Sequence, residues 1–172
     1  MTPDVFTLDY VGEPGRRAFY LQSRGGAGTH SFLVEKQQAA VLAEKLRDLL
    51  LLVDNEDTIR SSPPERDPAL ALVEPVEPEF RVGTMGLAYE EDADRVVIFM
   101  QSVEAAEDEE DPLAEDEPSG MRLLLRRDQA RAFVLHTVAV VAEGRPLCQL
   151  CGLPMDPEGH ICPASNGHRL SN

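Results

Sequence analysis

In both halves of this chain, apolar and polar residues first alternate, and the apolar residues then recur every three or four positions. In the first half they alternate along residues 5–10, 17–23 and 29–35, which predicts three strands joined by glycine-containing turns. Along residues 36–53 the apolar positions recur every three or four residues, which predicts a helix with one apolar face. The second half repeats this order, with predicted strands at 80–89, 95–103 and 121–126. Its predicted helix is capped by Asp128 and ends near Ala142.

Two local matches between the halves indicate an internal duplication. The segment 32–39 (FLVEKQQA) resembles 123–130 (LLLRRDQA), and 16–22 (RRAFYLQ) resembles 95–101 (RVVIFMQ). Chance similarity between two strand–helix junctions is the alternative. Three strands with one helix cover only one face of their sheet, so two such units can share a core or a continuous sheet. We therefore predict an α+β domain over residues 1–144, with two βββα units (about 4–53 and 79–143) and an antiparallel sheet.

Two polar segments interrupt this plan. Residues 54–77 are rich in Pro, Asp, Glu and Ser and link the halves. Residues 104–118 hold nine acidic side chains and no basic one, between the second and third predicted strands of the second unit. Such a run repels itself and offers few apolar anchors, so we expect a solvated, disordered loop. A mimic of nucleic-acid charge and a cation site are the alternatives.

Composition narrows the class of protein. The chain has 172 residues, of which 42% are hydrophobic but only 5% aromatic, which predicts an aliphatic core. The net charge of −15 argues against binding to nucleic acids or anionic membranes and favours basic protein partners. No targeting segment or bilayer-spanning stretch is evident, and the cysteine count is odd. We therefore expect a cytoplasmic protein, and the sequence leaves its oligomeric state open.

The three cysteines all lie in the C-terminal segment 145–172, which predicts a small zinc-binding knuckle. Cys148 and Cys151 form a Cys-x-x-Cys turn followed by glycine, and His160 and Cys162 follow within one short loop sequence. Three sulfurs and one imidazole make a closed tetrahedral zinc site. His160 is the favoured fourth ligand because it shares a turn with Cys162, and His168 is the alternate. A segment this short has too few apolar residues to fold without such a staple.

A redox role and a purely structural role of the thiols are weaker hypotheses for the cysteines. A redox pair normally starts a helix within a thioredoxin-like βαβ pattern, and no such pattern precedes Cys148. Free structural thiols scatter through cores rather than gather in one polar tail. A closed set of four ligands also leaves no open position for catalysis, so the predicted zinc is structural.

Enzyme signatures are missing from the sequence. It contains no nucleophile elbow, Walker loop, His-Glu-x-x-His or dinucleotide fingerprint. The glycines of residues 25–28 lie between two predicted strands, which favours a hairpin over a phosphate cradle. His30 and His136 are isolated, so we expect surface or satisfied core histidines rather than catalytic bases.

Arginines gather in two stretches of the sequence. Those stretches are Arg16, Arg17 and Arg24 in the first hairpin, and Arg122, Arg126 and Arg127 before the second helix. In a chain this acidic we expect them to balance nearby carboxylates. An anion-binding site is the alternative.

Several long motifs resemble the DUF3090 family of uncharacterised bacterial proteins. They are residues 12–22 (GEPGRRAFYLQ), 34–44 (VEKQQAAVLAE), 79–87 (EFRVGTMGL) and the C-terminal cysteine pattern. The resemblance implies that Cys148, Cys151, His160 and Cys162 form one set. The family often has an aromatic residue where this chain has His168, which supports His160 as ligand. The glycines of residues 82–86 then suggest a bulge or a close backbone approach, and a binding surface there.

We expect a non-enzymatic binding or adaptor protein with a structural zinc ion and a protein partner. One rival is an enzyme or small-ligand binder that uses the cleft between the two units, with arginines as anion anchors. A deep, convergent polar pocket between the units would favour that rival. A thiol redox or metal sensor is the second rival, and it would need exposed, unliganded sulfurs.

Overall fold

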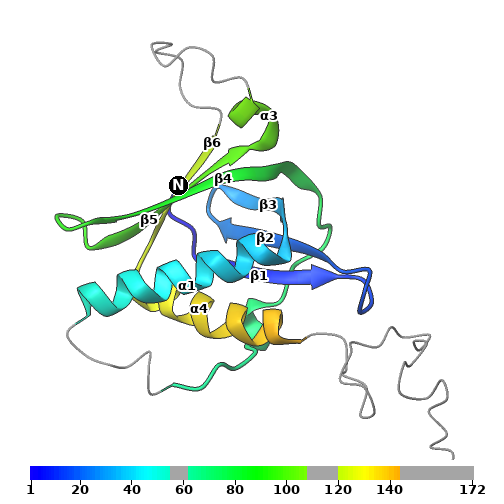
Figure 1. Ribbon diagram of the computed structural model, residues 1–172. Coiled ribbons are helices and arrows are strands. Elements are labelled where there is room, and N and C mark those ends of the chain that lie inside the picture. Colours follow the sequence, from blue (N-terminus) through cyan, green and yellow to red (C-terminus); the bar gives the residue numbers. More distant parts are fainter. Residues whose placement is uncertain (55–61, 108–119, 144–172) are drawn as a thin grey trace, which may run out of the picture.

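The computed structural model describes residues 1–54, 62–107 and 120–143, which form a mixed α+β fold (Figure 1). Three strands and a helix are followed by a short 3-10 helix, then by three more strands and a second long helix. In chain order the elements are β1 (Val5–Val11), β2 (Ala18–Gly25), β3 (Gly28–Val34), α1 (Lys36–Val53), η1 (Pro68–Leu70), β4 (Pro78–Glu90), β5 (Arg95–Ser102), α3 (Val103–Glu107), β6 (Gly120–Leu125) and α4 (Arg127–Ala142). The predicted order of strands and long helices is therefore present.

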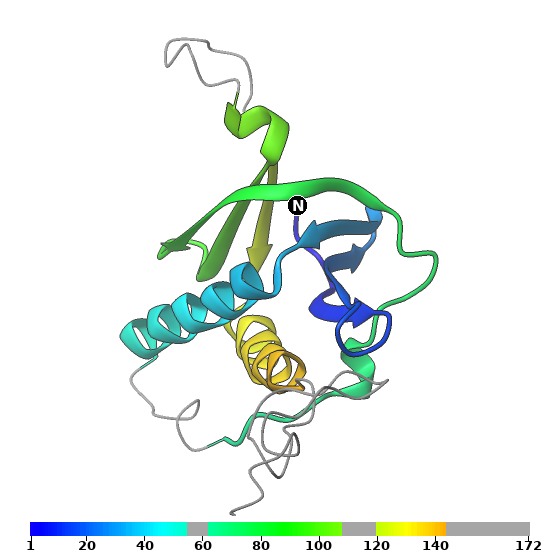
Figure 2. The ribbon, with the colours of Figure 1, turned by 45° about the vertical axis from the view of Figure 1, so that its right-hand side comes forward.

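All six strands form one sheet in the order β1-β2-β3-β4-β5-β6. Neighbours run antiparallel except β3 and β4, which are parallel and pair through Phe32 and Phe80. The prediction of an antiparallel sheet is wrong at this junction. The reason is that α1 carries the chain back along β3 before β4 begins, and such a crossover joins parallel strands. The strands arch over α1 and α4, which lie side by side beneath them (Figure 2).

The core fills the space between the inner face of the arch and the two helices. It is mainly aliphatic, as the composition predicted. Three phenylalanines lie at its centre. Phe6 of β1 stacks on Phe133 of α4 with ring centroids 4.7 Å apart. The fully buried large side chains are Phe6, Phe32, Phe133, Leu8, Leu21, Leu46, Leu50, Ile98, Met100, Leu123, Leu125 and His136.

The residues that precede β1 lie beside β6. The Met1 amine donates to the Arg122 carbonyl, and the Leu124 amide donates to the Met1 carbonyl, each at 2.8 Å. Because these bonds reach both neighbours of Leu123, Met1 lies opposite Leu123 as in a parallel ladder. The two outer strands of the sheet are thereby connected, and the start of the chain appears close to β6 in Figure 1.

The described part of the linker, from residue 62 onward, lies against the outer face of β1 to β3. The Gln22 amide nitrogen donates to the Val73 carbonyl at 3.0 Å, and its oxygen accepts the Val73 amide at 2.9 Å. The Thr7 hydroxyl donates to the Leu70 carbonyl, and Leu70 itself is buried. Two buried polar side chains of this face, Thr7 and Gln22, are thus satisfied by linker backbone. The sequence predicted a linker but not this covering role.

The second long helix begins two residues earlier than a cap at Asp128 requires. Arg126 is the N-cap, and its amide donates to the side-chain oxygen of Gln129 at 2.9 Å. Glu35 and Gln38 make the same contact at the start of α1, also at 2.9 Å. A glutamine at the third helical position therefore replaces the acidic cap that we predicted. Asp128 pairs instead with the Arg126 guanidinium at 3.0 Å.

The first residues of the acidic segment form a short helix. β5 ends at Ser102, and Val103–Glu107 forms the short helix α3 rather than the predicted loop. The Ser102 hydroxyl accepts the Ala105 amide at 3.0 Å, which is the usual capping contact at a helix start. Residues 108–119, the remainder of the predicted insertion, lie outside the described ranges. None of the helices in the described ranges is long and apolar enough to cross a membrane.

Candidate functional site

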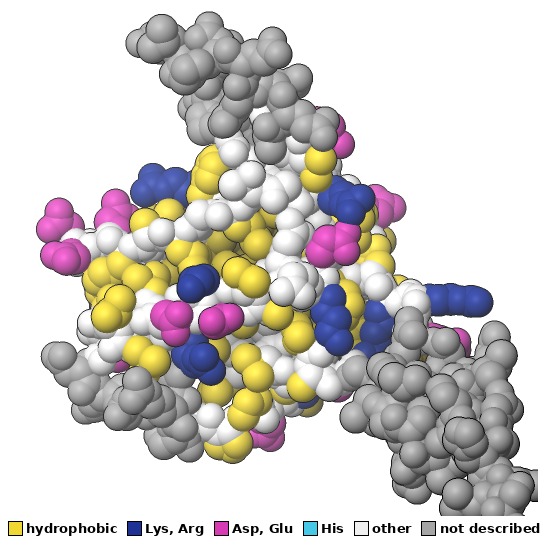
Figure 3. Space-filling view, in the orientation of Figure 1, with side chains coloured by type: hydrophobic (Ala, Val, Ile, Leu, Met, Phe, Trp, Pro, Cys, Tyr) yellow, Lys and Arg dark blue, Asp and Glu magenta, His cyan; other side chains and the backbone are white. Residues whose placement is uncertain are grey.

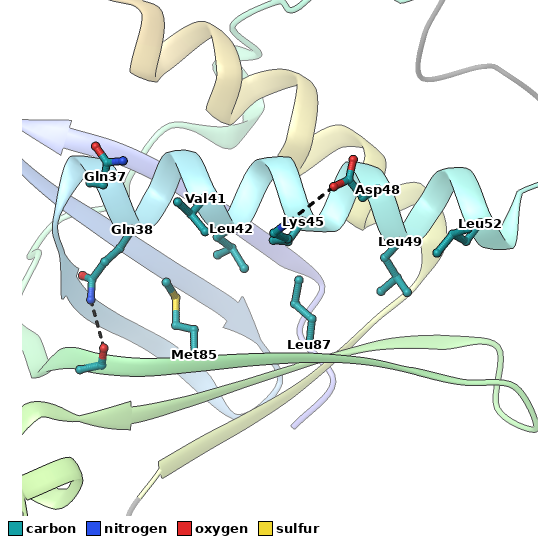
Figure 4. Close-up of a pocket in the computed structure, with 11 residues that line it drawn as sticks. Gln37, Gln38, Val41, Leu42, Lys45, Asp48, Leu49, Leu52, Met85 and Leu87 are labelled. Carbon is teal, nitrogen blue, oxygen red and sulfur yellow. Dashed lines mark hydrogen bonds and ion pairs between the residues drawn. The ribbon is translucent and has the colours of Figure 1, made fainter.

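An open apolar groove of about 650 Å³ lies between α1 and β4 (Figure 4). It lies between the two halves of the chain, because α1 ends the first βββα unit and β4 begins the second. The residues that line it are Gln37, Gln38, Val41, Leu42, Lys45, Asp48, Leu49 and Leu52 from α1, and Gly83, Met85 and Leu87 from β4. Hydrophobic side chains gather on this face of the molecule (Figure 3).

The helix wall exists because α1 carries two apolar stripes. One stripe, which includes Leu42, Leu46 and Leu50, is buried in the core. The second stripe leaves Val41 43% and Leu52 84% exposed, although both side chains are aliphatic. A helix that serves only the core needs one stripe, so the second is available for binding.

The strand wall is shaped by a bulge at Gly83. The register between β4 and β5 shifts between Val82 and Thr84, and a Cβ on Gly83 would lie 2.9 Å from the Cα of Val103. The predicted close backbone approach in residues 82–86 is therefore confirmed. Beyond the bulge, the half-buried side chains of Met85 and Leu87 point from β4 toward α1 (Figure 4).

Gln38 sets the distance between the walls at one end. Its side-chain nitrogen donates to the carbonyls of Val82 at 3.1 Å and Gly83 at 3.2 Å. The same side chain accepts the Glu35 amide in the helix cap. One glutamine therefore fixes the start of α1 both to its own cap and to β4.

The corresponding interface between α4 and β1 is closed. Gln129 donates to the carbonyls of Pro3 at 2.9 Å and Asp4 at 2.7 Å, as Gln38 does to β4. Four residues after Gln129, Phe133 stacks on Phe6, and seven residues after it the His136 Nε2 lies 3.0 Å from the Leu8 carbonyl.

In α1 the residues four and seven positions after Gln38 are smaller or point outward. Leu42 stands four residues after Gln38, and Lys45 stands seven after it. Lys45 is mostly exposed and lies 3.9 Å from Asp48, a long ion pair on the helix surface. Nothing from α1 fills the space over Met85 and Leu87 as Phe133 and His136 fill the space over β1. The groove is the result.

The far end of the groove is held by an ion-pair network. Arg127 binds Asp54 at 2.8 Å and Asp94 at 2.9 Å, and Arg131 binds Asp54 at 2.5 Å. The Tyr89 hydroxyl donates to Asp94 at 2.5 Å, which raises the pKa of Tyr89 and lowers that of Asp94. The β4–β5 turn is thus tied to the end of α1 and the start of α4, so both walls are fixed.

A second polar cluster holds the end of α4. Glu143 accepts hydrogen bonds from the Tyr10 hydroxyl and from Arg66, each at 2.7 Å. Arg66 also binds both oxygens of the buried Asp9, at 2.6 and 2.7 Å. Arg17 lies 3.9 Å from the Tyr10 ring centroid and donates to the Glu143 carbonyl. Every one of these side chains has a protein partner, which indicates a structural role.

His136 is a satisfied core histidine, as predicted. Its Nδ1 accepts the Asp67 amide at 3.0 Å and its Nε2 donates to the Leu8 carbonyl at 3.0 Å, so the ring is neutral. His30 pairs with Glu79 at 2.5 Å near the surface. Neither histidine faces the groove between α1 and β4.

Burial lowers the pKa of His136 below its usual range, opposed by a weaker effect of Asp9. A histidine whose folded pKa is depressed stabilises the fold fully above the unfolded pKa of about 6.5, and this contribution falls as pH drops below it. We expect the free energy of unfolding to fall with acidification by at most about 1.4 kcal/mol per pH unit from this group. Urea unfolding of wild type and His136→Gln at pH 7.5 and 5.5 measures it. Equal pH dependence in both proteins would contradict the assignment, and His30→Gln is the control.

The two groups of arginines do not converge. Arg17 and Arg24 lie at opposite ends of β2, where Arg24 donates to the Ala69 carbonyl at 3.1 Å, and Arg16 is exposed in the preceding turn. In the second group every member has a carboxylate partner: Arg122 with Glu90 at 3.8 Å, Arg126 with Asp128, and Arg127 with Asp54 and Asp94. The prediction that these three balance nearby acids is confirmed.

The predicted zinc ligands Cys148, Cys151, His160 and Cys162, and the alternate His168, all lie outside the described ranges. Within those ranges no group of three or more His, Cys, Asp or Glu side chains is arranged to hold a metal ion. The lining of the groove is mostly apolar, and its two charged side chains, Lys45 and Asp48, lie 3.9 Å from each other.

Sequence comparison gives one match. The model of a family described as "Protein of unknown function (DUF3090)" matches residues 1–162. No curated protein and no solved structure matches the chain.

Proposed function

The chain belongs to the DUF3090 family, and since that family has no assigned function we propose one from the chain's own residues. The protein is a binding or adaptor protein whose groove between α1 and β4 receives an apolar segment of a protein partner. The observation that carries the proposal is the second apolar stripe of α1, with Val41 and Leu52 exposed opposite the half-buried Met85 and Leu87.

The shape of the groove favours a peptide over a small molecule. Its lining runs from Gln37 to Leu52 along α1, which corresponds to roughly 22 Å of helix. Small-molecule sites usually enclose most of the ligand surface, whereas this groove is open along its length. Its volume of about 650 Å³ falls within the small-molecule range, so a small apolar ligand in the cleft between the two units is the second candidate.

Charge indicates the kind of partner. The net charge of −15 repels acidic surfaces and attracts basic ones. Glu90, Glu91 and Asp92 form the tip of the β4–β5 hairpin at one end of the groove. A partner segment with apolar side chains and a neighbouring lysine or arginine complements this surface.

Photo-crosslinking in cells tests the proposal. We expect a benzophenone amino acid at Leu52 or Val41 to give covalent adducts with a protein, because these side chains line the groove. The matched control is Val11, which is 49% exposed at the end of β1 and away from the groove. Adducts at Leu52 should disappear when Leu87→Glu places a charge in the groove.

Three results would contradict a protein partner. Equal adducts at Val11 and Leu52 would mean non-specific capture, and no adduct from either groove position would mean that no partner binds there. An adduct whose added mass is that of a small molecule would favour the second candidate.

We also propose that the C-terminal segment binds one structural zinc ion through Cys148, Cys151, Cys162 and His160. The donor set supports this, because three thiolates and one imidazole complete a tetrahedral site with no open position. When bound, the ion would supply folding energy to a segment with few apolar residues. The domain before it is already held at Glu143 by Tyr10, Arg17 and Arg66.

We propose further that the two βββα units descend from one ancestral unit. The equivalent helix caps and the equivalent glutamine bonds, from Gln38 to β4 and from Gln129 to β1, support this. Alignment of the two halves across many family members tests it. The halves should match each other better than shuffled halves do, and equal scores would count against common descent.

A further inference from the structure

β4 has one edge that carries no strand along most of its length. It pairs with β3 only through Pro78, Phe80 and Arg81, whereas it pairs with β5 from Val82 to Glu90. β3 ends at Val34 and the chain turns into α1, so within the described residues no strand continues beside β4. Gln38 reaches only the carbonyls of Val82 and Gly83. Within the described residues, the backbone groups of residues 84 to 90 that point away from β5 therefore have no strand partner.

This edge runs along the groove. Met85 and Leu87 point from β4 toward α1, and the alternate side chains of the strand point to the opposite face (Figure 4). A chain lying against the edge of β4 would place every second side chain beneath α1. The groove and the open edge thus form one continuous surface.

The side chains along this edge do not prevent another strand from pairing with it. Thr84, Gly86 and Ala88, which face away from α1, are small and exposed. A Cβ on Gly86 would meet only the Phe99 Cβ at 3.9 Å, so neither crowding nor backbone conformation requires glycine there. Exposed edges in other proteins are usually protected by lysine, proline or inward-pointing charges. Small residues instead allow another backbone to approach closely.

The first unit shows what a blocked edge looks like. There Gln129 reaches the carbonyls of Pro3 and Asp4, and His136 reaches that of Leu8 on β1. Phe133 fills the space above the strand. Beside β4, Lys45 of α1 stands at the spacing of His136 and pairs with Asp48 on the surface instead.

We infer that the edge of β4 accepts an extended segment of a partner protein as an added strand, with alternate apolar side chains entering the groove beneath α1. This inference rests on the proposed function and specifies how the groove is used. Main-chain hydrogen bonds would supply affinity, and the groove would supply specificity. The segment spans about seven residues and carries a lysine or arginine near Glu90, Glu91 and Asp92. A second copy of this chain is disfavoured as occupant, because each copy carries a net charge of −15.

The test uses a fluorescent peptide of about seven residues in which valine and lysine alternate. Two derivatives carry N-methyl groups, one on the odd amides and one on the even amides. Because the amides of a strand point alternately to its two sides, only one set can face β4. We expect one derivative to lose affinity at least about tenfold and the second to keep it within about twofold. Amide hydrogen exchange of the protein should slow between residues 84 and 90 when the unmodified peptide is present.

Matched variants of the protein locate the site. Met85→Glu should weaken the unmodified peptide at least about tenfold, because it places a charge in the groove. Thr84→Glu, which faces the opposite side of the sheet, should not weaken it.

The contradicting outcomes separate the two proposals. If both methylated peptides bind as tightly as the parent, or if no peptide binds while crosslinks from Leu52 to a protein persist, strand addition is wrong and the proposed function stands. If peptide binding and crosslinks are both absent, both proposals fail. A dimer in analytical ultracentrifugation that Met85→Glu dissociates would identify a second copy as the occupant and overturn the inference.

Discussion

Cys151→Ser should release the zinc ion that we propose for the C-terminal segment and leave the α+β domain folded. Removing one of four ligands opens the site, and metal binding supplies most of the folding energy of a segment this short. Within the described ranges the buried core beneath the arch of strands ends at Val140, so it should survive. Metal analysis of purified wild type should give one zinc per chain, and the variant should give close to none. Wild-type binding should weaken on acidification, because thiolates and imidazole must be deprotonated to bind.

Two histidine variants decide the fourth ligand. His160→Ala should lower zinc content more than His168→Ala does, and the reverse result would exchange their roles. Wild type that is purified without chelators, carries no metal and shows three freely titrating thiols would refute the zinc site. A thiol redox or metal sensor would then become the leading hypothesis for the cysteines.

Phe6→Ala should lower the free energy of unfolding by about 3 to 5 kcal/mol. Phe6 is 1% exposed and stacks on Phe133, so its removal leaves a cavity between β1 and α4. Met85 holds the corresponding position on β4 but faces the open groove. Met85→Ala should therefore cost only about 1 kcal/mol, since little packing is lost at a half-exposed site.

Urea unfolding of both variants measures the difference. A loss of about 3 kcal/mol or more for Met85→Ala would mean that α1 packs on β4 as tightly as α4 packs on β1. The groove would then not be open in solution. Val41→Ala, at an exposed position of α1, serves as the control and should change stability by less than about 0.5 kcal/mol.

The order of strands and helices was predictable because the alternation typical of strands and the three-to-four-residue spacing typical of helices are both strong in this chain. The parallel pairing of β3 with β4 was not, because alternation along a strand carries no information about its direction or its neighbour. The covering role of the linker was also missed. Its signal was present in the polar residues that alternate with apolar ones in β1 and β2, such as Thr7 and Gln22, which are buried against Leu70 and Val73.

The groove could be predicted only in part. The glycines of residues 82–86 indicated a close backbone approach, and Gly83 provides it. The opening itself depends on which residues follow Gln38 and Gln129 at equal spacing. Leu42 and Lys45 leave space where Phe133 and His136 close it. That contrast becomes informative only once the two glutamines are seen in equivalent contacts.

The sheet has two parallel junctions, one between β3 and β4 and one between Met1 and β6. They determine the order in which the sheet can assemble. β1 to β3 and β4 to β5 close short loops, which cost little chain entropy, so these hairpins can form early. The junction of β3 with β4 must wait for α1 and the linker, and the bond from Met1 to Arg122 joins residues 121 positions apart. Loop-closure entropy places these two junctions late in folding. Until they close, the folding chain exposes the strand edges that meet at these junctions. Within the described residues, the edge of β4 beyond Arg81 stays without a strand partner even after closure.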